Sequence, residues 1–368
     1  MTIGIDARTI FTEEVTGVGN YVTQLVSFLQ KNNHRLILFT DKVEHTPDWI
    51  DKATTSIAYG PSKNRYLWEQ ITLLQLLKKY PVDIYHATWN HGIPIFYKRR
   101  TVLTICDIIP IALNGIYNKT LKEKINFLLY RASLYSSLKM ANQIITISHS
   151  SKNDIVKYCS ATQNKITSIY LGCDADPSLN INNEILTTHG IGDRFIVYFG
   201  GFEKRKNVES LIEAFLEINK IHAGIQLILI GKKNAYYNQY LSKYKHPKII
   251  FTDYLRDSDL HFLVSKAIMS VYPSLYEGFG LPIIESMKLG VPVITSKNSS
   301  LAEIAEKRAH LIDYSNKEKI KDAIMTLLNN AELCAKLRRN GIEYAKKFNW
   351  TDTIQKTMEV YRKILLLK

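Results

Sequence analysis

The feature that most constrains the fold is an alternation of short apolar runs with longer amphipathic stretches. The run TIGIDA at 2–7 precedes a stretch at 16–30 whose apolar residues recur at helical spacing. Further candidate strands of the first half lie at 35–41, 82–88, 101–107, 142–148 and 165–171. Strands that alternate with helices predict a parallel sheet covered by helices on both faces.

The same cycle begins again at RFIVYFGGF, residues 194–202. Candidate strands follow at 225–231, 248–255, 268–274 and 291–296, with helical stretches such as NVESLIEAFLEINK between them. A chain of 368 residues exceeds the size at which one core stops growing, about 250–300 residues. We therefore expect two consecutive α/β domains, joined in the polar, turn-rich stretch at 171–184.

Composition limits the class of protein. Apolar residues make up 46% of the chain, but no apolar run approaches the ~18 residues of a membrane span and no signal peptide is recognisable. We expect a cytoplasmic protein. The four cysteines, Cys106, Cys159, Cys173 and Cys334, form no Cys-x-x-Cys pair, which argues against a zinc site or a disulfide framework.

The formal net charge of +14 points to an anionic partner, which could be nucleic acid, anionic lipid or a phosphorylated substrate. Residues 1–180 hold 20 Lys and Arg against 14 Asp and Glu, and the remainder holds 28 against 20. Because this excess is spread over both halves, we expect no nucleic-acid partner. The basic stretches at 63–80 and 121–140 could lie peripherally on the inner face of a cell membrane, or be amphipathic helices with solvated basic faces.

Two glycine-rich turns follow candidate strands. In TGVGNYV, Gly17 and Gly19 resemble the start of a dinucleotide fingerprint, although Val22 stands where the third glycine would be. Asp41, after the second strand, lies near the position of a ribose-binding acid. The turn is either a tight strand-to-helix connection or a loop that approaches a ligand, and a nicotinamide-dependent oxidoreductase remains one alternative.

The stretch PSLYEGFGLPIIESMKLGVPVI at 273–294 is more specific. It places Glu277 in a glycine-rich turn after a strand and Glu285 just inside the next helix. The glycines allow a close approach of the backbone to a ligand, and Pro282 suits the first turn of a helix. The helix N-terminus suits a phosphate. Because carboxylates repel phosphate, we expect these two glutamates to accept hydrogen bonds from sugar or ribose hydroxyls.

A second turn supplies the cations that a diphosphate needs. In GGFEKRKNVES, Lys204, Arg205 and Lys206 follow the first strand of the second domain and precede a helix that opens near Asn207. Loops at the carboxyl ends of parallel strands share one edge of the sheet, so this turn and the 273–294 turn should face the same ligand.

These residues resemble glycosyltransferase family 4, retaining enzymes of the GT-B fold, in its mannosyltransferase-like branch. The similarity lies in YFGGFEKRKNVESLIEAF, IIFTDYLRDSDL and PSLYEGFGLPIIESMKLGVPVITSKNSSLAEI. It implies two Rossmann-like domains whose parallel sheets face each other across a cleft. The domains would be an acceptor-binding part at 1–172, completed by a C-terminal helix at 350–368 that crosses back, and a donor-binding part at 173–349.

The resemblance also implies roles for single residues. Glu277 would contact the transferred sugar, and Asp107 would be a fallback candidate for a catalytic base. The donor-binding residues would be Arg205 and Lys206 at the diphosphate, Glu285 at the ribose, the amides of Phe279, Gly280 and Leu281 at the phosphate and sugar, and Tyr254 with Leu255 near the base. Gly17 and Gly19 would form a loop over the diphosphate and the acceptor.

The sequence departs from the family pattern in two places. Many relatives have His-Asp where this chain has Cys106-Asp107, and some have Arg where Gly201 stands. Cysteine cannot supply the cationic hydrogen bonding of histidine. The pairs at 174/176 and 257/259 mimic a metal-binding Asp-x-Asp, but their places favour turn or capping roles. We expect no essential metal and no cofactor, since the nucleotide sugar is itself a substrate.

The function that follows is transfer of a hexose from a nucleotide sugar to a glycan or lipid-linked glycan acceptor in the synthesis of surface polysaccharide. GDP-mannose is the leading donor, with UDP-hexoses and dTDP-rhamnose as alternatives. A noncatalytic scaffold that binds nucleotide sugar or glycan is the alternative of another class.

Overall fold

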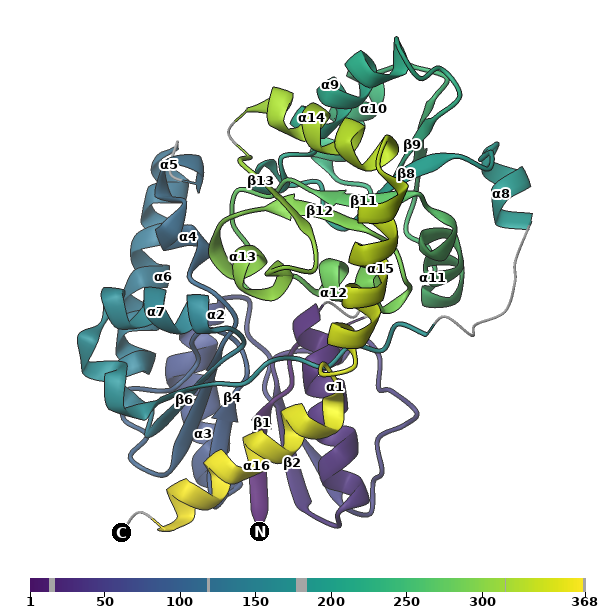
Figure 1. Cartoon of the computed structure of the whole chain (residues 1–368). Helices are drawn as coiled ribbons and strands as arrows, with labels where there is room; N and C mark the ends of the chain where they lie inside the picture. Colours follow the sequence, from purple (N-terminus) through teal and green to yellow (C-terminus); the bar gives the residue numbers. More distant parts are fainter. Residues whose placement is uncertain (13–16, 118–119, 177–183, 315, 367–368) are drawn as a thin grey trace. The chain divides into compact units, whose positions relative to one another are not determined.

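The structure is a computed structural model that describes residues 1–12, 17–117, 120–176, 184–314 and 316–366 (Figure 1). The chain divides into two compact units. The first contains residues 1–172 and 350–368, and the second contains residues 173–349. Of the expected connection at 171–184, residues 177–183 lie outside the described part.

The first unit is built on a parallel sheet of seven strands among its described residues, in the order β3-β2-β1-β4-β5-β6-β7. The strands are β1 (Thr2–Asp6), β2 (Arg35–Thr40), β3 (Thr55–Tyr59), β4 (Ile84–Ala87), β5 (Thr101–Ile105), β6 (Gln143–Thr146) and β7 (Ile166–Ser168). Every residue of β4, β5 and β6 is buried, as expected for strands covered on both faces.

Helical segments connect these strands. They are α1 (Gly17–Lys31), α2 (Arg65–Leu67), the π-helical turn η1 (Trp68–Thr72), α3 (Leu73–Lys79), α4 (Ile109–Ala112), α5 (Asn114–Tyr117), α6 (Leu121–Met140), α7 (His149–Tyr158), the 3₁₀ segment η2 (Ser160–Lys165) and α16 (Trp350–Leu366). The last of these comes from the far end of the chain and contacts α1 (Figure 1).

A buried hydrogen-bond chain attaches α16 to the sheet of the first unit. Nδ1 of His86 on β4 lies 2.6 Å from the hydroxyl of Tyr361, and its Nε2 lies 2.7 Å from the hydroxyl of Thr104 on β5. The hydroxyl of Thr353 donates to the carbonyl of Tyr170 at 2.8 Å. The C-terminal helix is therefore part of the first unit.

The second unit repeats the design with a parallel sheet of six strands among its described residues, in the order β10-β9-β8-β11-β12-β13. The strands are β8 (Phe195–Phe199), β9 (Gln226–Ile230), β10 (Ile249–Thr252), β11 (Met269–Tyr272), β12 (Val293–Ser296) and β13 (His310–Ile312). The helical segments are α8 (Glu184–His189), the 3₁₀ turn η3 (Lys204–Lys206), α9 (Val208–Asn219), α10 (Ala235–Lys243), α11 (Asp257–Lys266), α12 (Leu281–Lys288), α13 (Ser299–Ala305), α14 (Lys317–Leu328) and α15 (Ala331–Ala345).

Each sheet has one topological switch point, where the order in which successive strands are added reverses from one side of the sheet to the other. In the first unit this point lies between β1 and β4, and in the second between β8 and β11. The loops that follow the two strands at such a point diverge, and the crevice between them is where ligands bind in open α/β sheets. The fold thus predicts one ligand-binding position in each unit.

The prediction of two doubly wound α/β domains is confirmed, and two details of it are wrong. Strands β3 and β13 were missed, because each is a short edge strand with partly exposed residues. The glycine loop expected at Gly17 and Gly19 is instead the first turn of α1, and Gly19 is buried there. Among the described residues, no helix has the length and apolar character needed to cross a bilayer.

Candidate functional site

The turn after β8 and the turn after β11 meet through an ion-paired cluster. Nη1 of Arg205 lies 2.7 Å from one carboxylate oxygen of Glu277, and Nζ of Lys206 lies 2.7 Å from the other. The backbone joins the two turns as well, since the amide of Leu275 donates to the carbonyl of Arg205 at 2.7 Å. The two loops that the sequence predicted to face one ligand therefore lie together at the β8/β11 switch point.

The charges of this cluster hold Glu277 in its ionised form. The carboxylate is 13% exposed, and burial alone would raise its pKa. Attraction to Lys206 and Arg205 outweighs burial, so the pKa of Glu277 lies below its ordinary value. The cluster carries two cations and one anion, which leaves a net positive charge at the switch point.

The backbone of the Glu277 turn is anchored to the start of α13. The amide of Glu277 donates to the hydroxyl of Ser299 at 3.1 Å, and the hydroxyl of Ser300 donates to the carbonyl of Glu277 at 2.8 Å. Asn207, at φ 55°, donates from its side-chain amide to the carbonyls of Pro273 and Tyr314, each at 3.2 Å. The loop that presents Glu277 is thus held at both ends by residues for which the sequence analysis predicted no such role.

The glycine-rich turn leads into α12 in the way the sequence predicted. Gly280 caps the helix at φ 117°, a conformation that favours glycine, and Pro282 occupies the first turn. Gly290 follows the helix end at φ 72°. No described residue accepts a hydrogen bond from the amides of Gly280 or Leu281. These amides and the positive end of the helix dipole have the chemical character that suits an anion.

Phe279 occupies the core side of the same turn. Its ring is 4% exposed and packs edge-to-face against Phe348, with ring centroids 6.0 Å apart. Burial of this side chain fixes the path of the backbone into α12. Only the main chain of Phe279 is therefore placed to meet a ligand.

Glu285 lies separately from Glu277, on the first turns of α12. Among the described residues, none donates a hydrogen bond to its carboxylate. Burial, and then the negative charges of Asp257 and Asp174, raise its pKa to about 7. A carboxylate with raised pKa and open acceptor positions suits a ligand that brings hydroxyl donors.

Tyr254 and Leu255 follow β10 at the edge of the sheet. The Tyr254 side chain is 67% exposed, and Leu255 is partly buried. They immediately precede α11, whose Asp257 acts electrostatically on Glu285. Asp257 also acts electrostatically on Tyr254.

Asp107 and Cys106 belong to the first unit, after β5. The Asp107 carboxylate accepts from the amide of Ile109 at 3.0 Å, which places it at the entrance to α4. The amide of Cys106 donates to the side-chain carbonyl of Asn90 at 2.9 Å, and burial raises the pKa of the thiol well above its usual range. Cys106 is therefore a neutral thiol.

The described part of the chain contains no group of three or more His, Cys, Asp or Glu side chains that could hold a metal ion. Asp257 and Asp259 lie in the first turn of α11, where carboxylates favour the positive end of the helix dipole. The sites described above consist of amides, cations and carboxylates, which are groups suited to phosphate and hydroxyl ligands.

Two family models match the chain, one over each unit. The model described as Glycosyltransferase Family 4 matches residues 15–177, and the model described as Glycosyl transferases group 1 matches residues 184–347. Together the two models match most of the chain, which therefore belongs to the glycosyltransferases that they describe.

This glycosyltransferase is 26% identical to O-antigen chain mannosyltransferase B of Escherichia coli, over 95% of its own length and 96% of the relative. Solved structures share its fold. Sucrose-phosphate synthase of Thermosynechococcus elongatus has a TM-score of 0.80 at 19% identity, covering 100% of this chain and 99% of that one. Anabaena HepE, solved with UDP and glucose, has a TM-score of 0.75 at 14% identity, covering 98% and 99%.

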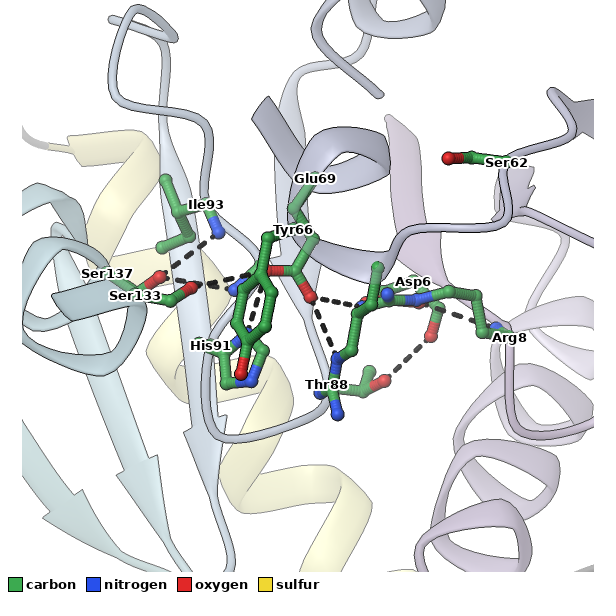
Figure 2. Close-up of polar contacts among 12 residues, drawn as sticks. Asp6, Arg8, Ser62, Tyr66, Glu69, Thr88, His91, Ile93, Ser133 and Ser137 are labelled. Carbon is green, nitrogen blue, oxygen red and sulfur yellow. Dashed lines mark hydrogen bonds and ion pairs between the residues drawn. The ribbon is translucent and has the colours of Figure 1, made fainter. Parts of the chain in front are cut away.

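The glycosyltransferase also has a polar network at the β1/β4 switch point that the sequence analysis missed (Figure 2). Glu69, on η1, is fully buried and accepts from Arg8 at 3.1 Å, Arg65 at 3.2 Å and His91 at 2.8 Å. The stretch at 63–80 is therefore not a helix with a purely solvated basic face. The spacing of Arg65 and Glu69 was the available signal, but a helical i, i+4 pair ordinarily indicates a surface salt bridge.

Proposed function

We propose that the chain transfers mannose from GDP-mannose to a glycan or lipid-linked glycan acceptor, with retention at the anomeric carbon. The observation that carries this proposal is the Arg205–Glu277–Lys206 cluster beside the N-terminus of α12. The mannose donor is supported by the name of the full-length Escherichia coli relative. A UDP-hexose is the alternative donor, because HepE was solved with UDP and glucose. The third candidate donor is dTDP-rhamnose.

The leaving diphosphate is the group that the cations serve. When the bond between the anomeric carbon and the phosphate oxygen breaks, its electron pair stays on the diphosphate. Arg205, Lys206 and the amides of Gly280 and Leu281 stabilise that charge, and one such preorganised donor contributes on the order of 3 kcal/mol. A guanidinium has five N–H donors, so Arg205 can contact Glu277 and a phosphate oxygen at the same time.

In this proposal Glu277 contacts the transferred sugar. As an ionised acceptor it can take hydrogen bonds from sugar hydroxyls, and it lies next to the phosphate position, where positive charge develops on the anomeric carbon. The acceptor hydroxyl attacks from the face that the phosphate leaves. Its proton passes to the leaving phosphate oxygen, so no separate base is required. Asp107 stays the fallback base of this proposal.

The remaining predicted residues hold the nucleoside. Glu285 accepts hydrogen bonds from the two ribose hydroxyls, and Tyr254 with Leu255 lies against the base. Gly17 and Gly19, in the first turn of α1, contribute to the acceptor side of the first unit. We propose no essential metal and no cofactor, because Arg205, Lys206 and the helix N-terminus can neutralise the diphosphate.

We also propose that α6 contacts the surface of an anionic membrane, where a lipid-linked acceptor would lie. Its N-terminal half exposes Leu121 (75%), Ile125 (52%) and Leu128 (65%) at helical spacing, beside Lys122 and Lys124. Apolar area and basic charge together favour an interfacial helix. Leu128→Glu should reduce co-flotation with phosphatidylglycerol vesicles, while Ile221→Glu, at another exposed apolar residue, should not. Equal flotation of both variants would contradict this role.

The donor assignment is tested by a thermal-shift panel of GDP, UDP, dTDP and their sugars. A ligand that binds only the folded state raises its stability, so GDP and GDP-mannose should give the largest shifts. No shift with any nucleotide would contradict the donor site. The noncatalytic alternative, which Cys106 keeps open, predicts a shift with a nucleotide sugar but no release of nucleoside diphosphate.

A further inference from the structure

The buried network of the first unit lies where its fold nominates a ligand position. Asp6 ends β1, and Thr88 and His91 follow β4, so the network lies at the β1/β4 switch point. The hydroxyl of Thr88 donates to the carbonyl of Asp6 at 2.7 Å, which joins the two strand ends. Glu69 enters from η1 and contacts the same cluster (Figure 2).

The charges of this network nearly cancel. Arg8 donates to both carboxylate oxygens of Asp6, at 2.9 and 2.7 Å, and also to Glu69. Arg65 donates to Glu69 as well. Two guanidinium groups thus face two carboxylates, so an anionic ligand would gain little net attraction. An uncharged ligand with several hydroxyls fits a mixed set of donors and acceptors better.

Two polar atoms of this cluster are buried without a partner among the described residues. They are Nε2 of His91 and Nη2 of Arg65. The His91 side chain is 1% exposed, and a buried polar group without a hydrogen bond is costly to keep. The first atom accepts and the second donates, which matches the two capacities of a hydroxyl group.

The hydrogen-bonding character of Nε2 follows from its neighbour. Glu69 is ionised, because contacts with His91, Arg8 and Arg65 overcome the effect of burial and lower its pKa to about 2. An ionised carboxylate only accepts, so Nδ1 of His91, 2.8 Å away, carries the ring proton. Burial keeps the ring neutral by lowering its pKa. The remaining nitrogen therefore presents a lone pair that requires a donor.

Aromatic rings enclose this position. Tyr66 stacks on His91 with centroids 5.8 Å apart and planes at 18°, and it lies over the network in Figure 2. The guanidinium of Arg65 lies 4.8 Å from the ring centre of Trp89. Tyr66 is partly exposed, so a ligand can reach the buried atoms by displacing its ring. Apolar ring faces with a few directed polar groups are typical of a small-molecule site.

We propose that these residues form a subsite for an uncharged sugar ring of the acceptor, in which Nε2 of His91 accepts a hydrogen bond from a sugar hydroxyl. Nη2 of Arg65 donates to a hydroxyl oxygen of the same ring, and Glu69 fixes the orientation of His91. The subsite rests on the proposed function, because it gives the glycan acceptor a place in the first unit.

The test uses the full chain and methyl α-D-mannopyranoside as the probe, detected by saturation-transfer difference NMR. In His91→Asn, the side-chain amide can still donate to Glu69, but nothing replaces Nε2. We expect binding about tenfold weaker than in the wild type, the effect of one lost hydrogen bond. His34→Asn is the matched control, because His34 precedes β2 and therefore lies at the amino ends of the strands, whereas His91 lies at their carboxyl ends.

A second variant tests the same proposal in case His91→Asn fails to fold. Arg65→Met keeps the aliphatic stem over Trp89 and removes the guanidinium of a side chain that is 37% exposed. It should weaken mannoside binding by a similar factor. In transfer assays both variants should raise KM for the acceptor and leave KM for GDP-mannose unchanged, a split that a merely structural role would not produce.

Several results would overturn the subsite. They are no saturation transfer in the wild type, equal binding by the wild type and both variants, or displacement of the mannoside by inorganic phosphate. The thermal shift given by GDP-mannose, measured on the same samples, reports on the second unit separately. A normal shift with an unaffected mannoside signal in His91→Asn would reject the subsite and leave the proposed function standing.

Discussion

The raised pKa of Glu285 makes donor binding depend on pH in a defined direction. Burial, with the charges of Asp257 on α11 and of Asp174 at the start of the second unit, raises this pKa to about 7. Lys288, on α12 with Glu285, donates to the carbonyl of Cys173. If Glu285 accepts hydrogen bonds from ribose hydroxyls, only its ionised form binds the donor well.

The size of the effect follows from the titration. A group with a pKa of about 7 is about 90% ionised at pH 8 and about 10% ionised at pH 6. The proton must leave before the donor binds, so affinity should fall about tenfold between these two pH values. Glu285→Gln removes the titration and the charged hydrogen bonds, which contribute about 1.5–3 kcal/mol. This variant should bind about 10- to 100-fold more weakly at pH 8, with no dependence on pH.

The assay is isothermal titration calorimetry with GDP-mannose between pH 6 and pH 8. The nucleotide sugar is preferred to GDP, because the terminal phosphate of GDP titrates with a pKa near 6. Repeating the titration in buffers of different ionisation enthalpy counts the protons released on binding. Glu332→Gln, at an exposed residue of α15, is the matched control. Affinity that is constant with pH or higher at pH 6, or a Glu285→Gln variant that keeps the wild-type slope, would refute the reasoning.

Three further predictions concern charge and stability. Arg205→Ala should lower the rate of GDP release from GDP-mannose about 100-fold, because one hydrogen-bond donor to the diphosphate is lost. Lys204→Ala, at the exposed neighbouring residue in η3, should leave that rate unchanged. Equal rates in the two variants would contradict the assignment. Tyr361→Phe leaves Nδ1 of His86 without its partner and should lower the free energy of unfolding by about 1–3 kcal/mol in a urea titration. Burial lowers the pKa of His86 to about 3, so below pH 6.5 the unfolded chain binds a proton that the folded chain does not. The free energy of unfolding of the wild type should therefore fall as the pH drops from 6.5 towards 3. An unchanged free energy of unfolding across that range would contradict the buried neutral ring.

Much of the candidate site in the second unit could be predicted from sequence, because the information that forms it is local. Gly280, Pro282 and Gly290 fix the turn and the ends of α12 through their own backbone preferences. Arg205 and Glu277 follow strands of one parallel sheet, so strand order and the shared carboxyl edge bring them together. Their pairing at 2.7 Å confirms the expectation that the two turns meet.

The first unit was harder to predict, because its network depends on packing between distant segments. Arg8, Glu69 and His91 come from three parts of the chain, and nothing in their local sequence announces that they meet. Glu69 lies on a π-helical turn, which has more residues per turn than an α-helix. The altered spacing directs the Glu69 side chain into the core, although the sequence pattern places it on a polar face. Gly17 was assigned to a loop because TGVGNYV resembles the start of a dinucleotide fingerprint, yet here Gly17 begins α1.

The central claim is that the cluster at the β8/β11 switch point binds and uses GDP-mannose. Its most direct test is the rate of mannose transfer from GDP-mannose to lipid-linked glycans in a membrane fraction, compared between the wild type and Glu277→Ala at saturating donor. The account predicts that transfer is nearly abolished in Glu277→Ala and unaffected in the Glu332→Gln control. Wild-type transfer by Glu277→Ala would contradict it.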